Sequence, residues 1–194
     1  MKNKKIIGLL GLLAIAISVT VGITYAAFTD KAEVLGSTFN VGSADLMFLE
    51  DLALGTDPSN YRDELTGPSF TNIGPGWTQD YLLKLVSLGT SEISISTNAY
   101  YDTANDPESI REDILVEIIK WYDTNQNGIL DEGEEGPNLG QKTIIKWKTE
   151  GFTLGELFYG QTMGLILRFS APSISAAKQG AGAIFDFEFN SIQL

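Results

Sequence analysis

Hydrophobic and polar residues alternate along several short stretches of this chain, as they do in β-strands that bury one face. The last stretch is the clearest, because Phe185, Phe187 and Phe189 share one side and polar residues take the other. Similar patterns, or runs of apolar and β-branched residues, predict strands over 38–47, 80–86, 92–99, 114–122, 141–149, 163–170 and 185–190. Short strands with polar turns between them predict an all-β, jelly-roll-like two-sheet sandwich.

One or two short helices are expected between the strands. Asp106 followed by Pro107 is an N-cap followed by a proline at the first helical position, which predicts a helix through Asp113. A second short helix is predicted near 153–158. The isoleucines of 110–119 also fit a helical spacing, but the Ile, Val, Trp and Tyr content of 114–122 favours a strand. The acidic residues of this region are expected on a solvated face: Asp102, Asp106, Glu108, Glu112 and Asp113.

The first 26 residues have the parts of a secretory signal peptide. A lysine-rich start leads into an apolar run over 6–23, and the small residues Thr24 and Ala26 precede a polar segment. We therefore expect cleavage between Ala26 and Ala27, and a secreted chain of residues 27–194 that folds as a single domain. The alternative is a retained membrane anchor, because the run is nearly as long as the ~20 residues that span a bilayer. No second long apolar run follows, so membrane contact is expected only through the uncleaved signal.

Charge and composition exclude several functions. The 194 residues include 13 basic and 25 acidic side chains, a formal net charge of −12, which argues against binding nucleic acid or anionic lipid by charge and favours divalent cations. Histidine and cysteine are both absent, so Ser-His-Asp catalysis, Cys-His catalysis and histidine-ligated zinc are impossible. No pair of acids has the apolar setting of a glycosidase site. We expect no enzyme activity.

Residues 123–134 follow the ligand spacing of an EF-hand calcium loop. Oxygen-bearing side chains occupy the first, third, fifth, ninth and twelfth places, and Gly128 stands where the chain must turn sharply. Calcium prefers about six to eight oxygens in a flexible geometry, so the spacing predicts a calcium site of modest affinity. A solvated hairpin turn is the alternative, since Asp, Asn and Gly are ordinary turn residues. The expected ligands are Asp123, Asn125, Asn127, Asp131, Glu134 and the backbone carbonyl of Ile129.

The elements on either side of this loop are expected to be strands. Gly136 and Pro137 follow the loop closely and would break the second helix of an EF-hand. A loop between two strands suits a structural role, in which the ion neutralises a cluster of carboxylates and fixes a long hairpin.

The N-terminal sequence resembles that of the TasA/camelysin family. Thr-Tyr-Ala-Ala-Phe-Thr-Asp over 24–30 matches the family's start, where a signal peptidase of the SipW type cuts just before Ala-Phe, and 38–46 match the Phe-x-x-Gly-x-x-Asp-Leu strand that follows. Residues 70–77 and 179–189 resemble the turn before the family's second strand and its closing strand. The calcium loop and the long 50–68 loop are not part of that pattern. The resemblance implies a jelly-roll subunit of extracellular filaments in a biofilm matrix.

What the resemblance implies for assembly is donor-strand exchange, in which the freed N-terminal segment of one subunit adds a strand to the sheet of the next. The donor would be residues 27–37, starting at Ala27, with Phe28, Val34 and Leu35 as anchors. Such a head-to-tail contact between copies of one chain builds an open fibre. The alternative is an ordinary first strand of a monomer, which would suit a calcium-binding accessory or adhesion module on the cell surface. A third possibility, a camelysin-like metalloendopeptidase, would have to work without histidine.

Overall fold

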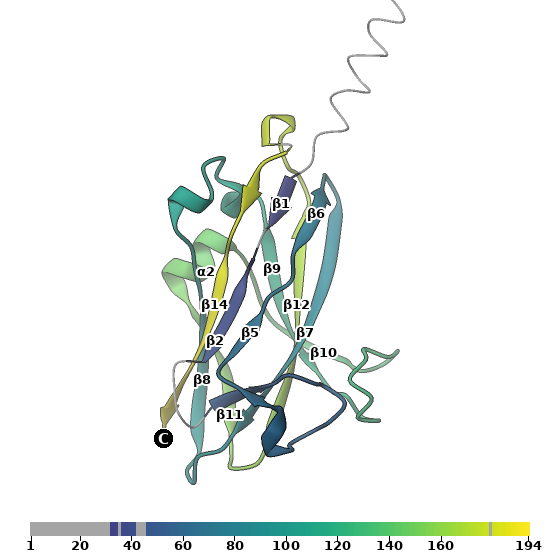
Figure 1. Ribbon diagram of the computed structural model, residues 1–194, viewed down its shortest axis with the longest axis vertical. Coiled ribbons are helices and arrows are strands. Elements are labelled where there is room, and N and C mark those ends of the chain that lie inside the picture. The colour runs from purple at the N-terminus through teal and green to yellow at the C-terminus, as the bar shows by residue number, and fades with distance from the viewer. Residues whose placement is uncertain (1–31, 35, 42–45, 179) are drawn as a thin grey trace, which may run out of the picture.

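Two β-sheets pack face to face in the computed structural model, which describes residues 32–34, 36–41, 46–178 and 180–194 (Figure 1). Within these residues, the larger sheet has six strands, each antiparallel to its neighbours. The order across this sheet is β10 (Glu135–Thr143), β9 (Leu115–Trp121), β12 (Thr162–Ala171), β7 (Trp77–Ser87), β3 (Leu46–Leu49) and β4 (Tyr61–Arg62). The predicted all-β two-sheet sandwich is confirmed.

The facing sheet has five strands in the described part of the chain and includes a parallel pair, because β14 runs parallel to β2 and antiparallel to β8. Its order is β11 (Phe152–Leu157), β8 (Ile93–Tyr100), β14 (Asp186–Gln193), β2 (Thr38–Val41) and β5 (Glu64–Thr66). A third, short sheet of β13 (Gly182–Ala183), β1 (Ala32–Val34) and β6 (Phe70–Ile73) lies at the upper end of the sandwich in Figure 1.

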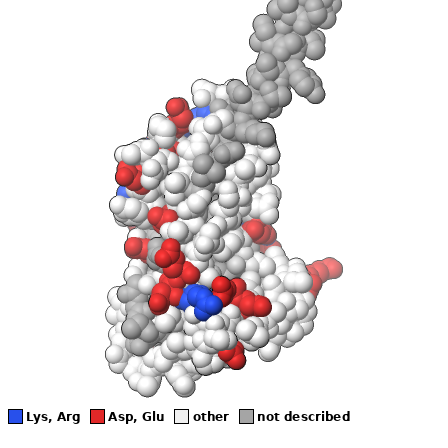
Figure 2. Space-filling model, viewed as in Figure 1, with Lys and Arg blue, Asp and Glu red and all other residues white. Residues whose placement is uncertain are grey.

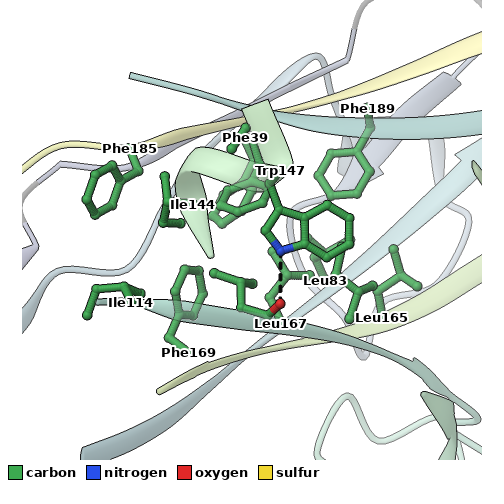
Figure 3. Close-up of a cluster of buried hydrophobic side chains, with 14 of the residues drawn as sticks. Phe39, Leu83, Ile114, Ile144, Trp147, Leu165, Leu167, Phe169, Phe185 and Phe189 are labelled. Carbon is green, nitrogen blue, oxygen red and sulfur yellow. Dashed lines mark hydrogen bonds between the residues drawn. The ribbon is translucent and has the colours of Figure 1, made fainter. Parts of the chain in front are cut away.

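The core lies between the two large sheets (Figure 3). Phe39 and Phe189 project from the five-stranded sheet, and Leu165 and Leu167 from the six-stranded sheet, and all four are fully buried. Trp147 fills the space between them, and its indole N–H donates a hydrogen bond to the Val116 carbonyl at 2.9 Å. A buried Trp needs such a partner, because an unpaired N–H in an apolar core is costly.

Most of the predicted strands are confirmed. The stretches 80–86, 92–99, 114–122, 163–170 and 185–190 correspond to β7, β8, β9, β12 and β14. The three phenylalanines of the last stretch are all fully buried, as their alternation predicted. The stretch 38–47 contains β2 and the start of β3, and residues 42–45 lie outside the described chain.

The predicted strand over 141–149 is wrong beyond Thr143, where β10 ends and helix α2 (Ile144–Glu150) begins. Ile144 and Trp147 are the fully buried residues of this helix, and their spacing of three positions puts them on one helical face. Lys148 of this helix is exposed, and its ammonium donates a hydrogen bond to the Tyr101 carbonyl at 2.9 Å. Burial of Trp147 in the core overrides the alternation of apolar and lysine residues.

The short helix predicted near 153–158 is also wrong, because Phe152–Leu157 form strand β11. The register of β11 against β8 shifts between Thr153 and Gly155, which marks a β-bulge. The bulge lets Leu154 and Leu157 both turn into the core, although an unbroken strand would put them on opposite faces. Their spacing of three therefore imitates a helix in the sequence.

The 3₁₀ turn Ile110–Glu112 replaces the helix predicted from Asp106, and another 3₁₀ turn, Thr103–Asn105, comes just before it. Asp106 is only 1% exposed, so its placement on a solvated face is wrong. Its carboxylate accepts the backbone N–H of Ile110 at 2.7 Å and pairs with the Arg111 guanidinium at 2.8 Å. These bonds make Asp106 an internal cap rather than a surface charge.

The N-terminal predictions fall largely outside the described residues, which include none of Ala26, Ala27, Phe28 and Leu35. Val34 is described, and it is fully buried in β1. None of the helices in the described ranges has the length and apolar character that a membrane crossing requires.

Candidate calcium-binding loop

The loop of residues 123–134 closes the hairpin between β9 and β10, so the prediction that it joins two strands is confirmed (Figure 1). Trp121 pairs with Glu135 at the base of the hairpin. The backbone N–H of Tyr122 donates to the Glu134 carbonyl at 2.9 Å. The strand ladder thus holds both ends of the loop side by side.

The first half of the loop winds around its own side-chain oxygens. Asp123 Oδ1 and Asn125 Oδ1 both accept the backbone N–H of Asn127 at 3.1 Å. Asn127 Oδ1 accepts the N–H of Ile129 at 2.8 Å. Gly128 has a φ of +73°, as expected for the sharp turn at the sixth place. These bonds orient the oxygens of the first, third and fifth predicted ligands.

Asp131, the predicted ligand at the ninth place, binds the predicted ligands at the third and fifth places. Its Oδ2 accepts the side-chain amide groups of Asn125 and Asn127, each at 2.8 Å. A carboxylate that collects two amide donors marks a point of negative potential in the middle of the loop. Metal binding there would require these amides to turn their oxygens toward the ion in place of their N–H groups.

Glu134 is the most constrained predicted ligand and is only 3% exposed. Its Oε1 accepts the backbone N–H and the hydroxyl of Thr124, both at 2.9 Å, and its Oε2 accepts the Asp131 N–H at 3.2 Å. Burial alone would raise the pKa of Glu134, but hydrogen bonds from the Asp131 and Thr124 amides, the Trp121 indole and the Thr124 hydroxyl lower this pKa to about 2. Glu134 is therefore a carboxylate at neutral pH.

The remaining predicted ligand, Ile129, has a side chain that is 61% exposed, so only its backbone can contribute. No group of three or more acidic, histidine or cysteine side chains converges on a metal-sized point in the described residues. An EF-hand-type site takes part of its ligands from amides and carbonyls, and this donor set consists of oxygen alone, which suits a hard cation.

Sequence reasoning missed a second segment that packs on the loop. A Cβ at Gly128 would lie 2.8 Å from the Ala53 nitrogen. Position 128 therefore needs glycine both for its positive φ and for the lack of space around it. Leu130 of the loop and Leu52 pack against a small apolar cluster of Ile119, Trp121 and Ile166. A cleft of about 440 Å³ runs between the two segments and is lined in part by Leu52, Thr56, Lys84, Tyr122 and Asp123.

A lysine that the sequence analysis did not single out contacts the loop. Lys84 lies on β7, and its ammonium is 2.5 Å from Asp123 Oδ2, with only 10% of the Lys84 side chain and 2% of the Asp123 side chain exposed. Basic groups are sparse elsewhere as well: Figure 2 shows acidic side chains scattered over the visible face, with few basic ones among them. No sequence motif marks Lys84, because its partner is 39 residues away.

Comparisons with known proteins do not place the chain in a family: no protein-family model matches it, and no curated protein does.

Proposed function

We propose that this chain is an exported structural protein, the subunit of an extracellular matrix filament that assembles by donor-strand exchange and is stabilised by calcium. The proposal rests on the signal-like start, the resemblance of residues 24–46 to the TasA/camelysin family and the all-β sandwich. The observation that carries it is the position of β1, a three-residue strand inserted between two others.

Strand β1 fills a groove. Val34 is the partner of Ala183 in the parallel β13 and of Phe70 in the antiparallel β6. The Val34 side chain is fully buried in the main core. Removal of β1 would therefore expose two strand edges and leave a cavity, and an extended segment is what such a groove accepts.

In the single chain, its own strand fills this groove, as the alternative of an ordinary first strand requires. The same segment of a neighbouring copy would make the same pairs, because every copy carries the same sequence. Gly36, with a φ of +63°, lies between β1 and β2 and is a suitable place for the chain to change direction. A change of direction there would let this segment leave its own groove for that of a neighbour, and exchange stays a prediction.

Calcium has a structural role in this proposal. The ion would be held by oxygens of Asp123, Asn125, Asn127, Asp131 and Glu134 with the Ile129 carbonyl, and it would offset the negative charge of the loop. Calcium should raise the melting temperature of the protein, and the double substitution Asp123→Ala with Glu134→Ala should abolish that rise. An equal rise in the double variant would exclude this loop as the site.

Electron microscopy of the mature chain tests the filament. Protein that begins at Ala27 with a free amino terminus should form long fibres, and protein with a folded tag fused in front of Ala27 should not. Mature protein that stays monomeric in sedimentation experiments at high concentration would argue for the second candidate. That candidate is a monomeric calcium-binding accessory or adhesion module of the cell surface, and the pairing of β1 within its own chain favours it.

A further inference from the structure

The outer face of the six-stranded sheet, turned away from the core, carries three cross-strand rows. Asp80 and Glu117 flank Arg168, and Leu82 and Ile119 flank Ile166. In the third row, Gly164 is the partner of Lys84 on one side and of Trp121 on the other. The third row lies next to the calcium loop, which starts two residues after Trp121.

Gly164 allows Lys84 to reach across the sheet. A Cβ at position 164 would lie 2.6 Å from the Trp121 carbonyl oxygen and 3.3 Å from the Trp121 ring, so no larger residue fits without a shift. With no side chain between them, the Lys84 ammonium reaches 4.8 Å from the centre of the Trp121 ring. A cation over an indole face is a favourable contact, more so when it is shielded from water.

The Lys84 ammonium joins three segments of the chain. From β7 it donates to the Leu52 carbonyl at 2.9 Å and to Asp123 Oδ2 at 2.5 Å. The Leu52 contact belongs to the segment that covers the apolar cluster of Ile119, Trp121 and Ile166. Lys84 is therefore one of the groups that tie the candidate calcium loop and its covering segment to the sheet.

The two oxygens of Asp123 have different partners. Oδ2 accepts hydrogen bonds from the Lys84 ammonium and from the backbone N–H of Gly128 at 3.0 Å, whereas Oδ1 accepts one bond from the described residues, from the N–H of Asn127 at 3.1 Å. Oδ1 thus keeps the lone pair that could reach an ion. Lys84 pairs with the Oδ2 atom and does not contact this lone pair of Oδ1.

We propose that Lys84 is an internal cation for the candidate calcium loop and competes with a metal ion for Asp123. Its charge holds Asp123 and the loop in place without metal, and the same charge repels a divalent ion and weakens its binding. The weakening of metal binding, the second part, rests on the proposed calcium function. The stabilisation of the loop without metal, the first part, does not. Both follow from burial, since charges shielded from water interact more strongly than exposed ones.

Replacement of Lys84 by Met keeps the length and apolar stem of the side chain but removes the charge. In EDTA, Lys84→Met should lower the melting temperature, because it leaves a buried carboxylate without its partner. Lys146→Met, which removes an exposed lysine, should leave the melting temperature unchanged. Equal melting temperatures for Lys84→Met and the wild-type protein would overturn the proposal.

A double-mutant cycle in EDTA keeps the test decisive if the single variant folds poorly. Asp123→Asn combined with Lys84→Met removes both charges, so the double variant should regain much of the melting temperature that Lys84→Met loses. Lys84→Arg, which keeps the charge, should stay close to the wild-type protein. If the losses of melting temperature caused by the two substitutions simply add up in the double variant, the proposed contact of Lys84 with Asp123 is refuted.

Calcium titration by calorimetry tests the second part. Lys84→Met should bind calcium more tightly than the wild-type protein, on the order of tenfold, because a positive charge near the ion is gone. Equal or weaker binding by Lys84→Met would overturn this part. A wild-type protein that binds no calcium would refute both the calcium function and the effect of Lys84 on metal binding. The EDTA measurements would still decide whether Lys84 stabilises the loop through Asp123.

Discussion

The indole N–H of Trp121 donates a hydrogen bond to Glu134 Oε2 at 3.2 Å, so the last residue of β9 holds the last predicted ligand of the calcium loop. Glu134 is thereby held by the sheet as well as by Thr124 and Asp131 of the loop. The first predicted ligand, Asp123, is likewise held by Lys84 of β7. The two ends of the ligand set are fixed to the sandwich, and the middle of the set is organised by its own amide groups.

Glu134→Gln should abolish the calcium-induced rise in melting temperature, because one amide oxygen replaces two carboxylate oxygens. Glu132→Gln is the matched control, since Glu132 lies in the same loop, is exposed and occupies no ligand place. Differential scanning calorimetry with and without calcium measures both. An unchanged response of Glu134→Gln would remove Glu134 from the site.

Acid should weaken the fold through Glu134. Its pKa is lowered from 4.5 to about 2 in the folded protein, so its stabilising contribution is present above pH 4.5 and is lost as the pH falls toward 2. In EDTA, the difference in unfolding free energy between the wild-type protein and Glu134→Gln should therefore shrink between these pH values. Urea unfolding at a series of pH values measures it, and a difference that stays constant down to pH 2 would contradict the assignment.

Gly164→Ala should destabilise the protein by roughly 1–3 kcal/mol, because the new methyl group meets the Trp121 backbone. Gly74→Ala is the control, since a Cβ at Gly74 would meet nothing within 4 Å. Urea unfolding of the two variants should separate them clearly. A neutral Gly164→Ala would show that β9 and β12 adjust without cost.

Val34→Ala should lower the unfolding free energy by on the order of 2 kcal/mol, because it truncates a fully buried core side chain. In fibres, the same change should slow assembly, since the donor segment carries Val34. Thermal unfolding and light scattering measure the two effects. A loss of stability with unchanged assembly would argue that Val34 acts only within its own chain.

The sandwich could be predicted because most strands bury one face, and burial with period two is visible in the sequence. The strand over 152–157 was not predicted, because the bulge between Thr153 and Gly155 puts Leu154 and Leu157 on the same side. The helix at 144–150 was not predicted, because the burial of Trp147 in the core cannot be seen in the local alternation of residues.

The candidate loop also has features that could be predicted from the sequence and features that could not. The ligand spacing over 123–134 and the turn at Gly128 are local, so they could be predicted from the sequence. The contact of Lys84 with Asp123 could not, because the register of three strands brings it about, with Gly164 between Lys84 and Trp121. Residues far apart in the sequence become neighbours only through that register.

A cysteine pair tests strand exchange most directly. The chain contains no cysteine, and Val34 and Ala183 are partners in the β1–β13 pair. Neighbouring strands lie about 4.8 Å apart, within the range of Cα distances that a disulfide spans. The mature chain with Val34→Cys and Ala183→Cys, oxidised under assembly conditions and run on a non-reducing gel, should give a ladder of covalent multimers that reduction collapses to monomer. Disulfides formed only within single chains, at every protein concentration, would contradict the account.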